Sequence, residues 1–272
     1  METPENYPEI VYKYRPWKGV GKKPLTHFEL YLASPKDFND PFDCRIPVNF
    51  LLLKEEGKNQ YIDEYIKKHK NTFLRDGRNE IEIKKFLQTR LHNSNIENFH
   101  KEFEEKSFRM YDQRIGILSL SIDWNNILMW SHYAREHSGY CIGFYEEKLR
   151  NSGLFDNGGP VSYPSEEEYP IIHPLEDIKG EPETIFKNSH NKAKDWFYEK
   201  EYRLTKFFHK EIPTLNCRQI HINSDYIAEV IIGLRTPEAH KAKIIKICKK
   251  KGIKVFQVKQ VEFKFLLDRD EI

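Results

Sequence analysis

Alternation between apolar and polar positions predicts most of the strands in this chain. Residues 9–15 alternate and end before Pro16, so they form the first predicted strand. A second strand is expected at residues 29–35, where a proline again closes the run. Later apolar and alternating stretches predict further strands at residues 116–121, 139–144, 199–208, 219–222, 228–233, 254–258 and 262–267.

A long charged segment interrupts this series of strands. Residues 55–110 are helical in period, which predicts a helical insert of about three helices. The positions expected to be buried in this insert are large and apolar or aromatic: Tyr61, Tyr65, Phe86, Leu87, Phe99 and Phe103.

Other helices are expected between the predicted strands. Asp123 can cap a helix that begins near Trp124 and runs through Tyr133. Two more helices are predicted at residues 183–198 and 237–251. The pattern therefore predicts an α+β protein, a single domain over residues 1–272 with a central, mostly antiparallel sheet.

The composition does not change the predicted fold, but it disfavours some classes of protein. Aromatic residues make up 14% of the 272 positions, which suffices for a core although the mean hydropathy is -0.74. No apolar run approaches the roughly 20 residues of a membrane-spanning helix. The N-terminus is acidic and polar rather than a secretory signal. The four cysteines form no CxxC pair, which disfavours a zinc knuckle and suits a reducing, cytoplasmic compartment: Cys44, Cys141, Cys217 and Cys248.

Charge is nearly balanced, with 44 Lys and Arg against 42 Asp and Glu. The one dense basic run lies between Lys241 and Lys254, and its apolar members have helical spacing. We therefore expect its lysines to form the solvated face of a helix, and we do not expect a dedicated duplex-DNA binder. The sequence also has no glycine-rich phosphate-binding loop.

Two strand motifs carry candidate binding groups. Arg15 ends the first predicted strand next to Tyr14, where a guanidinium can bind a phosphate or carboxylate with two parallel hydrogen bonds. The alternative is an ordinary surface ion pair. Ser119 and Ser121 share one face of their strand by alternation. They could orient a carboxylate or a ligand, or they could simply fill space beneath a helix.

The segment from Met129 to Phe144 contains aromatic and histidine side chains. Trp130 and Tyr133 are three residues apart and share a helix face, which is more often core than a cofactor site. His132 and His137 are more often satisfied core histidines than catalytic bases, because the sequence supplies no third group to orient them.

Two acidic motifs remain. Residues 38–43 read FNDPFD, which predicts a turn; Asp43 could instead help to bind a metal, although no metal site is predicted. Glu199 and Glu201 are two residues apart, so an extended segment would place both carboxylates on one face. Like charges that close need a cation or a raised pKa. The alternative is an edge strand whose charges block edge pairing.

Taken in order, YKYR, LASPKDFNDPFD, LSLS, MWSHYAREHSGYCIGF, WFYEKEYR and EVIIGL resemble a large bacterial family known only as a domain of unknown function. The resemblance covers roughly Val11 to Gly233, and its members occur in bacteria and mobile elements, some near anti-phage genes. It implies a cytoplasmic protein with an antitoxin or a defence-system partner.

A second resemblance is to arginine–serine–glutamate ADP-ribosyltransferases. The order of an arginine, a Ser-x-Ser strand and a Glu-x-Glu would be met by Arg15, by Ser119 with Ser121, and by Glu199 with Glu201. The family usually has Ser-Thr-Ser, whereas this chain has a leucine in the middle. The resemblance implies an ADP-ribosyltransferase-like fold with NAD as substrate.

Each motif then has an expected role. Arg15 would bind the pyrophosphate, Glu201 would stabilise the sugar cation, and Glu199 would orient the acceptor. Ser119 or Ser121 would hold Glu201 or contact the ribose, and Trp130 or Tyr133 would stack on nicotinamide. This hypothesis requires Arg15, Ser121 and Glu201 on one side of the sheet.

The sequence thus predicts an NAD-dependent ADP-ribosyltransferase-like toxin or anti-phage effector that modifies a protein or nucleic-acid acceptor. Two alternatives stay open. One is a non-catalytic module that senses a nucleotide or a phage component. The other is a metal-dependent hydrolase or nuclease that uses Asp43 with Glu199 and Glu201.

Overall fold

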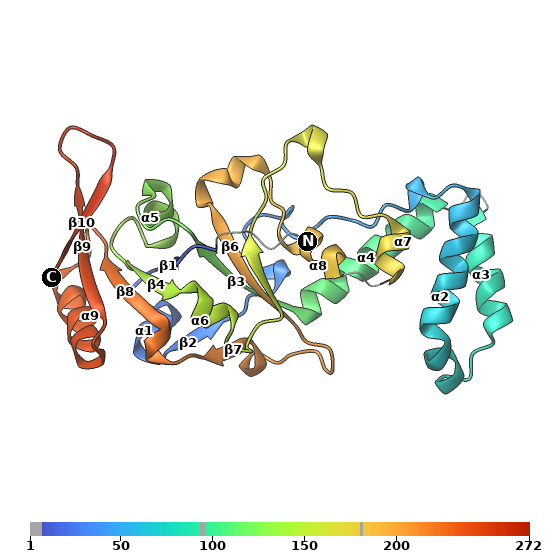
Figure 1. The fold of residues 1–272 in the computed structure, drawn as a ribbon, viewed down its shortest axis with the longest axis horizontal. Coiled ribbons are helices and arrows are strands. Elements are labelled where there is room, and N and C mark those ends of the chain that lie inside the picture. The colour runs from blue at the N-terminus through green and yellow to red at the C-terminus, as the bar shows by residue number, and fades with distance from the viewer. Residues whose placement is uncertain (1–6, 93–95, 180–181) are drawn as a thin grey trace. The chain divides into compact units, whose positions relative to one another are not determined.

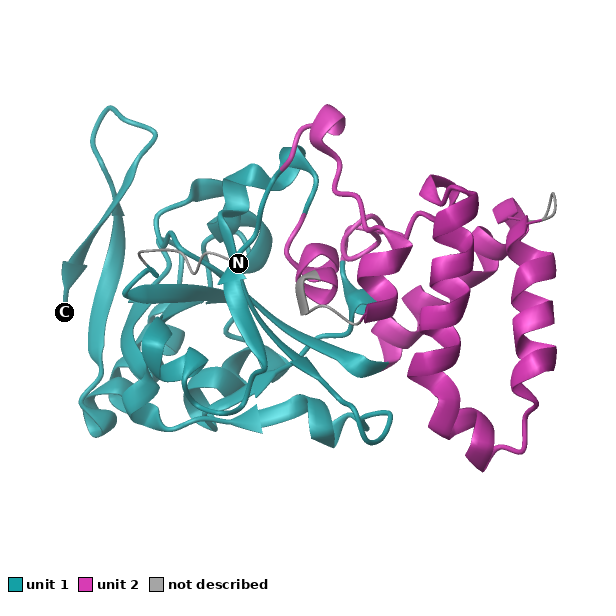
Figure 2. Cartoon of the chain, turned by 45° about the vertical axis from the view of Figure 1, so that its right-hand side comes forward, with its two compact units in different colours: residues 1–38, 114–163, 192–272 teal, residues 39–113, 164–191 magenta. Residues whose placement is uncertain are grey.

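The computed structural model describes residues 7–92, 96–179 and 182–272. The chain separates into two compact units (Figure 2). The first unit comprises residues 1–38, 114–163 and 192–272, and the second comprises residues 39–113 and 164–191. Long-range strand pairing holds the first unit together, whereas helices dominate the second.

The first unit is built on an eight-stranded sheet with the order β10-β9-β8-β4-β1-β3-β6-β5 (Figure 1). Every neighbouring pair is antiparallel except β8 and β9, which are parallel and joined by the helix α9 (Glu238–Lys251). The predicted mostly antiparallel sheet is therefore confirmed. Its strands are β1 (Ile10–Arg15), β3 (Ile115–Ser121), β4 (Tyr140–Tyr145), β5 (Asn157–Pro160), β6 (Glu201–Phe207), β8 (Ile227–Ile232), β9 (Lys254–Gln260) and β10 (Leu267–Glu271).

The sheet parts between β1 and β3. These strands pair at Tyr12 and Ser121, and β3 then pairs with Ala33 at Ile117 instead of with the rest of β1. Ala33 follows β2 (Glu29–Tyr31), which forms a separate two-stranded sheet with β7 (Gln219–His221). The strand predicted at residues 29–35 is thus shorter than expected, because its second half leaves β7 to reach β3.

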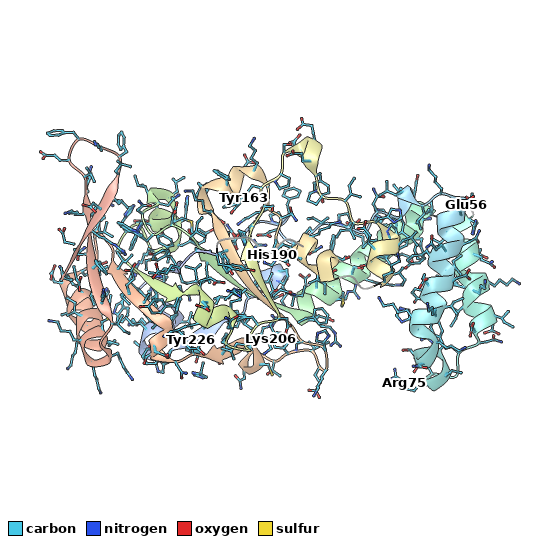
Figure 3. All side chains as sticks on the ribbon, in the orientation of Figure 1. Glu56, Arg75, Tyr163, His190, Lys206 and Tyr226 are labelled. Carbon is cyan, nitrogen blue, oxygen red and sulfur yellow. The ribbon has the colours of Figure 1, made fainter. Side chains whose placement is uncertain are left out.

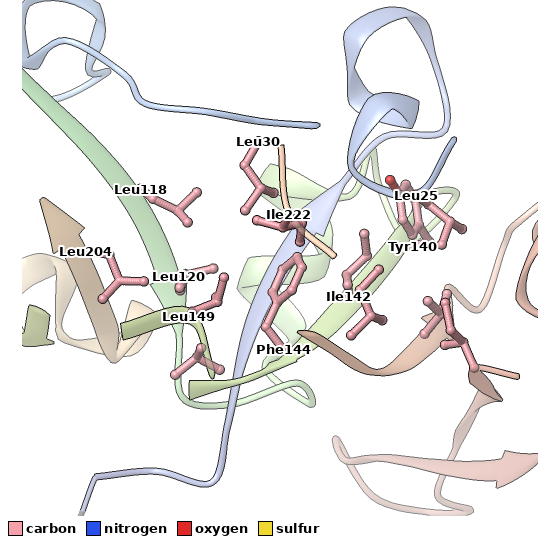
Figure 4. Packing of buried hydrophobic residues seen from close by; sticks show 14 of the residues in the cluster. Leu25, Leu30, Leu118, Leu120, Tyr140, Ile142, Phe144, Leu149, Leu204 and Ile222 are labelled. Atoms are coloured by element: carbon pink, nitrogen blue, oxygen red, sulfur yellow. The ribbon is translucent and has the colours of Figure 1, made fainter. Parts of the chain in front are cut away.

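Both faces of the large sheet are covered by apolar side chains. One face holds the larger cluster, which includes Leu118, Leu120, Ile142, Phe144 and Leu204 (Figure 4). The other face holds a smaller cluster around Tyr12, Tyr14, Trp130, Cys141 and Ile231. We call these the leucine face and the tyrosine face. Consecutive residues of each strand alternate between them, which is why β3, β4 and β8 in the middle of the sheet are largely apolar.

Short helices complete the first unit: α1 (Lys23–Thr26), α5 (Ile127–Tyr133) and α6 (Glu146–Arg150). Asn126 caps α5, since its side-chain oxygen accepts hydrogen bonds from the backbone of Leu128 and Met129. The expected cap, Asp123, instead forms an ion pair with Lys200 at 2.7 Å. The helix consequently begins three residues later than Trp124.

The second unit contains the helices α2 (Glu55–Arg75), α3 (Glu80–His92), most of α4 (Ile96–Arg114), α7 (Pro174–Lys179) and α8 (Pro182–Ser189). Its core packs around the ring of Phe50, which meets Tyr61, Phe99 and Phe103 edge-on at centroid distances of 5.1, 4.9 and 4.7 Å. Phe86, expected to be buried, is 58% exposed, and its ring lies beside the guanidinium of Arg90.

Two other predicted elements differ in the structure. Residues 183–198 do not form one helix: α8 ends at Ser189, and a 3-10 helix covers Lys194–Glu199. Residues 262–266 form the turn between β9 and β10 rather than a strand. Within the residues that the structure describes, no helix combines the length and the apolar character needed to cross a bilayer.

Candidate functional site

Two buried glutamates meet at the start of β6. Glu199 is the last residue of the 3-10 helix Lys194–Glu199, and Glu201 is the first residue of β6. Lys200 between them has a left-handed backbone with φ of 41°. The segment is therefore bent rather than extended as predicted. The two side chains nevertheless reach the same group, because both carboxylates contact the ammonium of Lys192.

Glu201 is held by three residues. Arg203 donates from Nε to Oε1 and from Nη2 to Oε2, both at 2.8 Å. Lys192 Nζ lies 3.4 Å from Oε2, and the side chain of Ser119 donates a further hydrogen bond. Burial raises the pKa of this carboxyl, but Arg203, Lys192 and Ser119 together outweigh burial and lower the pKa to about 2. Glu201 is thus ionised at neutral pH.

Glu199 has a smaller set of partners. Its Oε2 accepts from Lys192 at 2.5 Å, and its Oε1 accepts from the hydroxyl of Tyr133 at 2.6 Å. Ser121 donates to the backbone carbonyl of Glu199 at 2.7 Å and so fixes the bend that precedes Glu201. An ionised carboxylate has about four acceptor positions, so Glu199 keeps acceptor capacity that Glu201 does not have.

Strand register explains why these groups meet. Ser121 lies opposite both Tyr12 of β1 and Glu201 of β6, and Ser119 lies opposite Arg203. Directly opposed residues point to the same face, so all of these side chains lie on the tyrosine face. The predicted pairing of the Ser-x-Ser face with the glutamates is present in the structure. Tyr163, which Figure 3 labels, adds a contact at the same strand end. Its hydroxyl accepts a hydrogen bond of 2.8 Å from the backbone N–H of Glu201.

Arg15 does not join this group. It lies opposite Tyr140, a member of the leucine-face cluster, and three residues along β1 from Tyr12. Alternation therefore directs Arg15 to the face opposite Ser121 and Glu201. Its Nε is buried without a hydrogen-bond partner among the described residues, and burial lowers its pKa. The requirement that Arg15, Ser121 and Glu201 share one side is not met.

Lys13 is the cation of β1 that reaches β3. Its Nζ donates to the backbone carbonyl of Ser119 at 2.6 Å, where the two strands no longer pair with each other. Burial lowers the pKa of Lys13, and the neighbouring charge of Arg15 lowers it further, while Glu201 and Glu199 raise it; the result is about 7. A lysine that titrates near neutral pH is a common feature of functional sites.

The aromatic candidates have different positions. Trp130 is 0% exposed, packs edge-on against Tyr14 at 5.2 Å and donates to the carbonyl of Trp124. Tyr14 is 4% exposed and donates to the carbonyl of Asp123. Both are core residues in this structure, and neither has a ring face free for nicotinamide. Tyr133 is only partly buried and belongs to the site through its hydroxyl on Glu199.

The remaining candidates are two histidines of the first unit and Asp43 of the second. His132 is exposed beside the rings of Tyr133 and Tyr198, and His137 stacks on Trp130 with its Nε2 3.2 Å from the hydroxyl of Ser131. Asp43 is buried in the second unit, in the predicted turn. Among residues 7–92, 96–179 and 182–272, no three His, Cys, Asp or Glu side chains form a group that could hold a metal ion.

The sequence analysis missed Lys192 and Arg203, which contact the glutamates, and Lys13, which alternation places on the leucine face with Arg15 and which reaches the carbonyl of Ser119. Arg203 could have been found, because it follows Glu201 by two positions on the same strand and therefore shares its face. Lys13 stands inside the YKYR motif, but its burial depends on where β1 and β3 part. Lys192 lies inside the helix predicted at residues 183–198, but the structure ends that helix at Ser189, so its contact with the glutamates did not follow from the predicted element.

Comparison with known proteins adds one match. Residues 129–204 match the model of a family described as "Protein of unknown function (DUF2971)". The matched segment runs from α5 to β6, so it includes Tyr133, Lys192, Glu199, Glu201 and Arg203. The predicted resemblance to a domain of unknown function is confirmed for that segment. No curated protein and no solved structure matched the chain.

Proposed function

We propose that this chain is an ADP-ribosyltransferase-like enzyme that uses NAD, with the acid pair of Glu199 and Glu201 as its chemical centre. The observation that supports this proposal is the arrangement around the buried Glu201, where Arg203 donates two hydrogen bonds of 2.8 Å and Lys192 lies 3.4 Å away, which lowers the pKa of the carboxyl. A carboxylate that stabilises a developing sugar cation must be charged when the cation forms. Arg203, Lys192 and Ser119 are already in place around Glu201 and keep its carboxylate charged.

The proposed step breaks the bond between the ribose C1′ and the nicotinamide nitrogen. The bonding electrons leave with nicotinamide, and positive charge grows on the ribose next to Glu201. A nucleophilic atom of the acceptor then bonds to C1′ and loses a proton, which Glu199 can accept because it has unused acceptor positions. The contact of Glu201 with Lys192, at 3.4 Å, is longer than its two contacts with Arg203, and it is the one a ribose hydroxyl would replace.

The form of the hypothesis that needs Arg15, Ser121 and Glu201 on one side of the sheet is wrong, and the proposal made here keeps only the acid pair with Ser119. Arg15 points to the other face, so it is not proposed as the pyrophosphate clamp. Trp130 and Tyr14 are core residues, so neither is proposed to contact the nicotinamide ring. The site therefore depends on β3, β6 and the segment around Lys192. The acceptor and the role as a toxin or anti-phage effector stay predictions.

The test measures nicotinamide release from NAD and ADP-ribose adducts in a bacterial lysate. Glu201→Gln should lower nicotinamide release by about 10²–10³-fold. Glu199→Gln should reduce transfer while slow hydrolysis of NAD persists. Glu147→Gln is the matched control, because Glu147 is exposed on α6, and it should retain wild-type rates.

Folding must be checked in the same samples, because Glu201→Gln leaves Arg203 without its buried partner. Ser119→Ala serves as a second variant that removes one hydrogen bond to Glu201 and leaves the ion pair in place. It should lower nicotinamide release with little change in melting temperature. Full turnover by a folded Glu201→Gln protein would exclude Glu201 as the catalytic group. A wild type that releases no nicotinamide would favour the non-catalytic sensing module instead.

A further inference from the structure

The charge of this chain is concentrated on one helix. The segment from Pro237 to Lys254 contains seven lysines and a single glutamate, a net of +6, whereas the whole chain has a net of +2. The other residues therefore carry a net of −4. The excess of lysine creates a local positive potential around α9, although the net charge of the whole chain is small.

The lysines of α9 lie on its outer side. Ile244 and Cys248 are fully buried in the leucine-face cluster, and they fix which side of the helix faces the sheet. Lys243, Lys246 and Lys250 recur at helical spacing on the opposite side and are exposed. From Lys243 to Lys250 the helix rises by about 10 Å, at roughly 1.5 Å per residue.

These lysines have no acidic partners in the described residues. Lys23, Lys148 and Lys259 elsewhere in the first unit all form ion pairs, but no lysine between Lys241 and Lys254 does. The helix dipole favours cations only in the last turn, so it accounts for the lysines at positions 249–251. It does not account for Lys243 and Lys246, which lie in the middle of the helix.

We infer that the outer face of α9 binds nucleic acid through the phosphate backbone. We call this the lysine surface, and it consists of the exposed side chains of Lys243, Lys246, Lys249 and Lys250. Lysine acts as a flexible point charge, and the surface contains no arginine to pair with a base edge. Binding should therefore be insensitive to base sequence.

Other polyanions fit the surface less well. A helix that lies in a membrane interface needs an exposed apolar side, but the apolar residues of α9 face the sheet. A specific protein interface usually centres on exposed aromatic, large apolar or arginine anchors. Between Pro237 and Lys254 no large apolar side chain is exposed and no arginine occurs. Phosphates need only positive charge at suitable spacing.

The lysine surface is separate from the acid pair. α9 packs on the leucine face of the sheet, whereas Glu199 and Glu201 lie on the tyrosine face. Nucleic-acid binding can therefore be measured without NAD and does not depend on the proposed transferase activity. Failure of either proposal leaves the other in place.

The test is fluorescence anisotropy with a labelled single strand of about 20 nucleotides and with the corresponding duplex, over a salt series. The wild type should bind both probes, and log affinity should fall with log salt by about 0.7 per phosphate contacted on the single strand. The triple variant K243Q/K246Q/K250Q should lose about tenfold or more in affinity at low salt, and its salt slope should be shallower by about 2.

The control is K67Q/K68Q/K70Q, which removes the same charge from exposed lysines of α2 and should bind like the wild type. Melting curves of all three proteins should agree, because each substituted side chain is exposed. Three outcomes would overturn the inference: no binding by the wild type at low salt, an equal loss in both triple variants, or equally tight binding of polyglutamate or of anionic vesicles with matched charge.

Discussion

The guanidinium of Arg203 grips the carboxylate of Glu201 through two parallel hydrogen bonds of 2.8 Å, although the two residues are only two positions apart on one strand. Both side chains are buried, at 0% and 5% exposure. Because both groups are buried, removing one would leave the other as an unpaired charge and would strongly destabilise the fold. The stability of β6 therefore depends on this ion pair.

Removing the cation of this pair should be costly. Arg203→Met leaves Glu201 with a buried charge and only Lys192 and Ser119 to balance it, so we expect a loss of about 3–5 kcal/mol in the free energy of unfolding. Urea unfolding at neutral pH measures this loss. The double variant Arg203→Met with Glu201→Gln should recover much of it, because no unpaired charge remains. A single variant as stable as the wild type would mean that solvent reaches Glu201.

The same carboxylate should make stability depend on acid pH. The folded pKa of Glu201 is about 2 and its ordinary value is 4.5, so the folded state favours the ionised form. Its contribution is complete above pH 4.5 and is lost as the pH falls from 4.5 to about 2. Urea unfolding across this range should show a steeper fall for the wild type than for Glu201→Gln. Parallel curves would contradict the lowered pKa.

Lys13 should also make stability rise with pH, in a second window at alkaline pH. Its folded pKa is about 7 and its ordinary value is 10.5, so the unfolded chain binds more protons between these limits. Stability should therefore rise with pH in this window because of Lys13. Lys13→Met should lack that rise. The free energy of unfolding of the wild type should therefore increase relative to that of the variant between about pH 7 and 9.5. A constant difference between the two proteins would show that Lys13 keeps an ordinary pKa.

The position of Arg15 makes a prediction about the ligand. If NAD binds beside Glu201, it should raise the melting temperature by mass action. Since Arg15 is directed to the other face, Arg15→Ala should retain that shift, as should the exposed control Arg235→Ala. Loss of the shift in Arg15→Ala alone would restore Arg15 as a clamp and would require its side chain to turn past the end of β1.

Alternation was the most informative part of the sequence for the sheet. It placed Ser119 and Ser121 on one face, and the structure pairs that face with Glu201. Periodicity likewise located α9, because the buried Ile244 and Cys248 recur at helical spacing. These features depend on neighbouring residues in the chain, so a single sequence contains the information needed to predict them.

The face of Arg15 could not be predicted in the same way. Whether Arg15 and Ser121 share a side depends on the register between β1 and β3, which is fixed by a single paired position, Tyr12 with Ser121. A shift of one residue would have reversed the result. Lys192 was missed for a related reason: its contact with the glutamates depends on how a loop folds back, and no local pattern encodes that path.

The left-handed backbone of Lys200 has a consequence for copying this arrangement elsewhere. The two glutamates share one ammonium because the chain turns between a helical segment and a strand, and Ser121 ties down the carbonyl at that turn. Grafting Glu-Lys-Glu onto a straight strand would reproduce the residues without the turn. A designer would have to transplant the bend itself, and glycine in place of Lys200 should be tolerated there because only the backbone angle is needed.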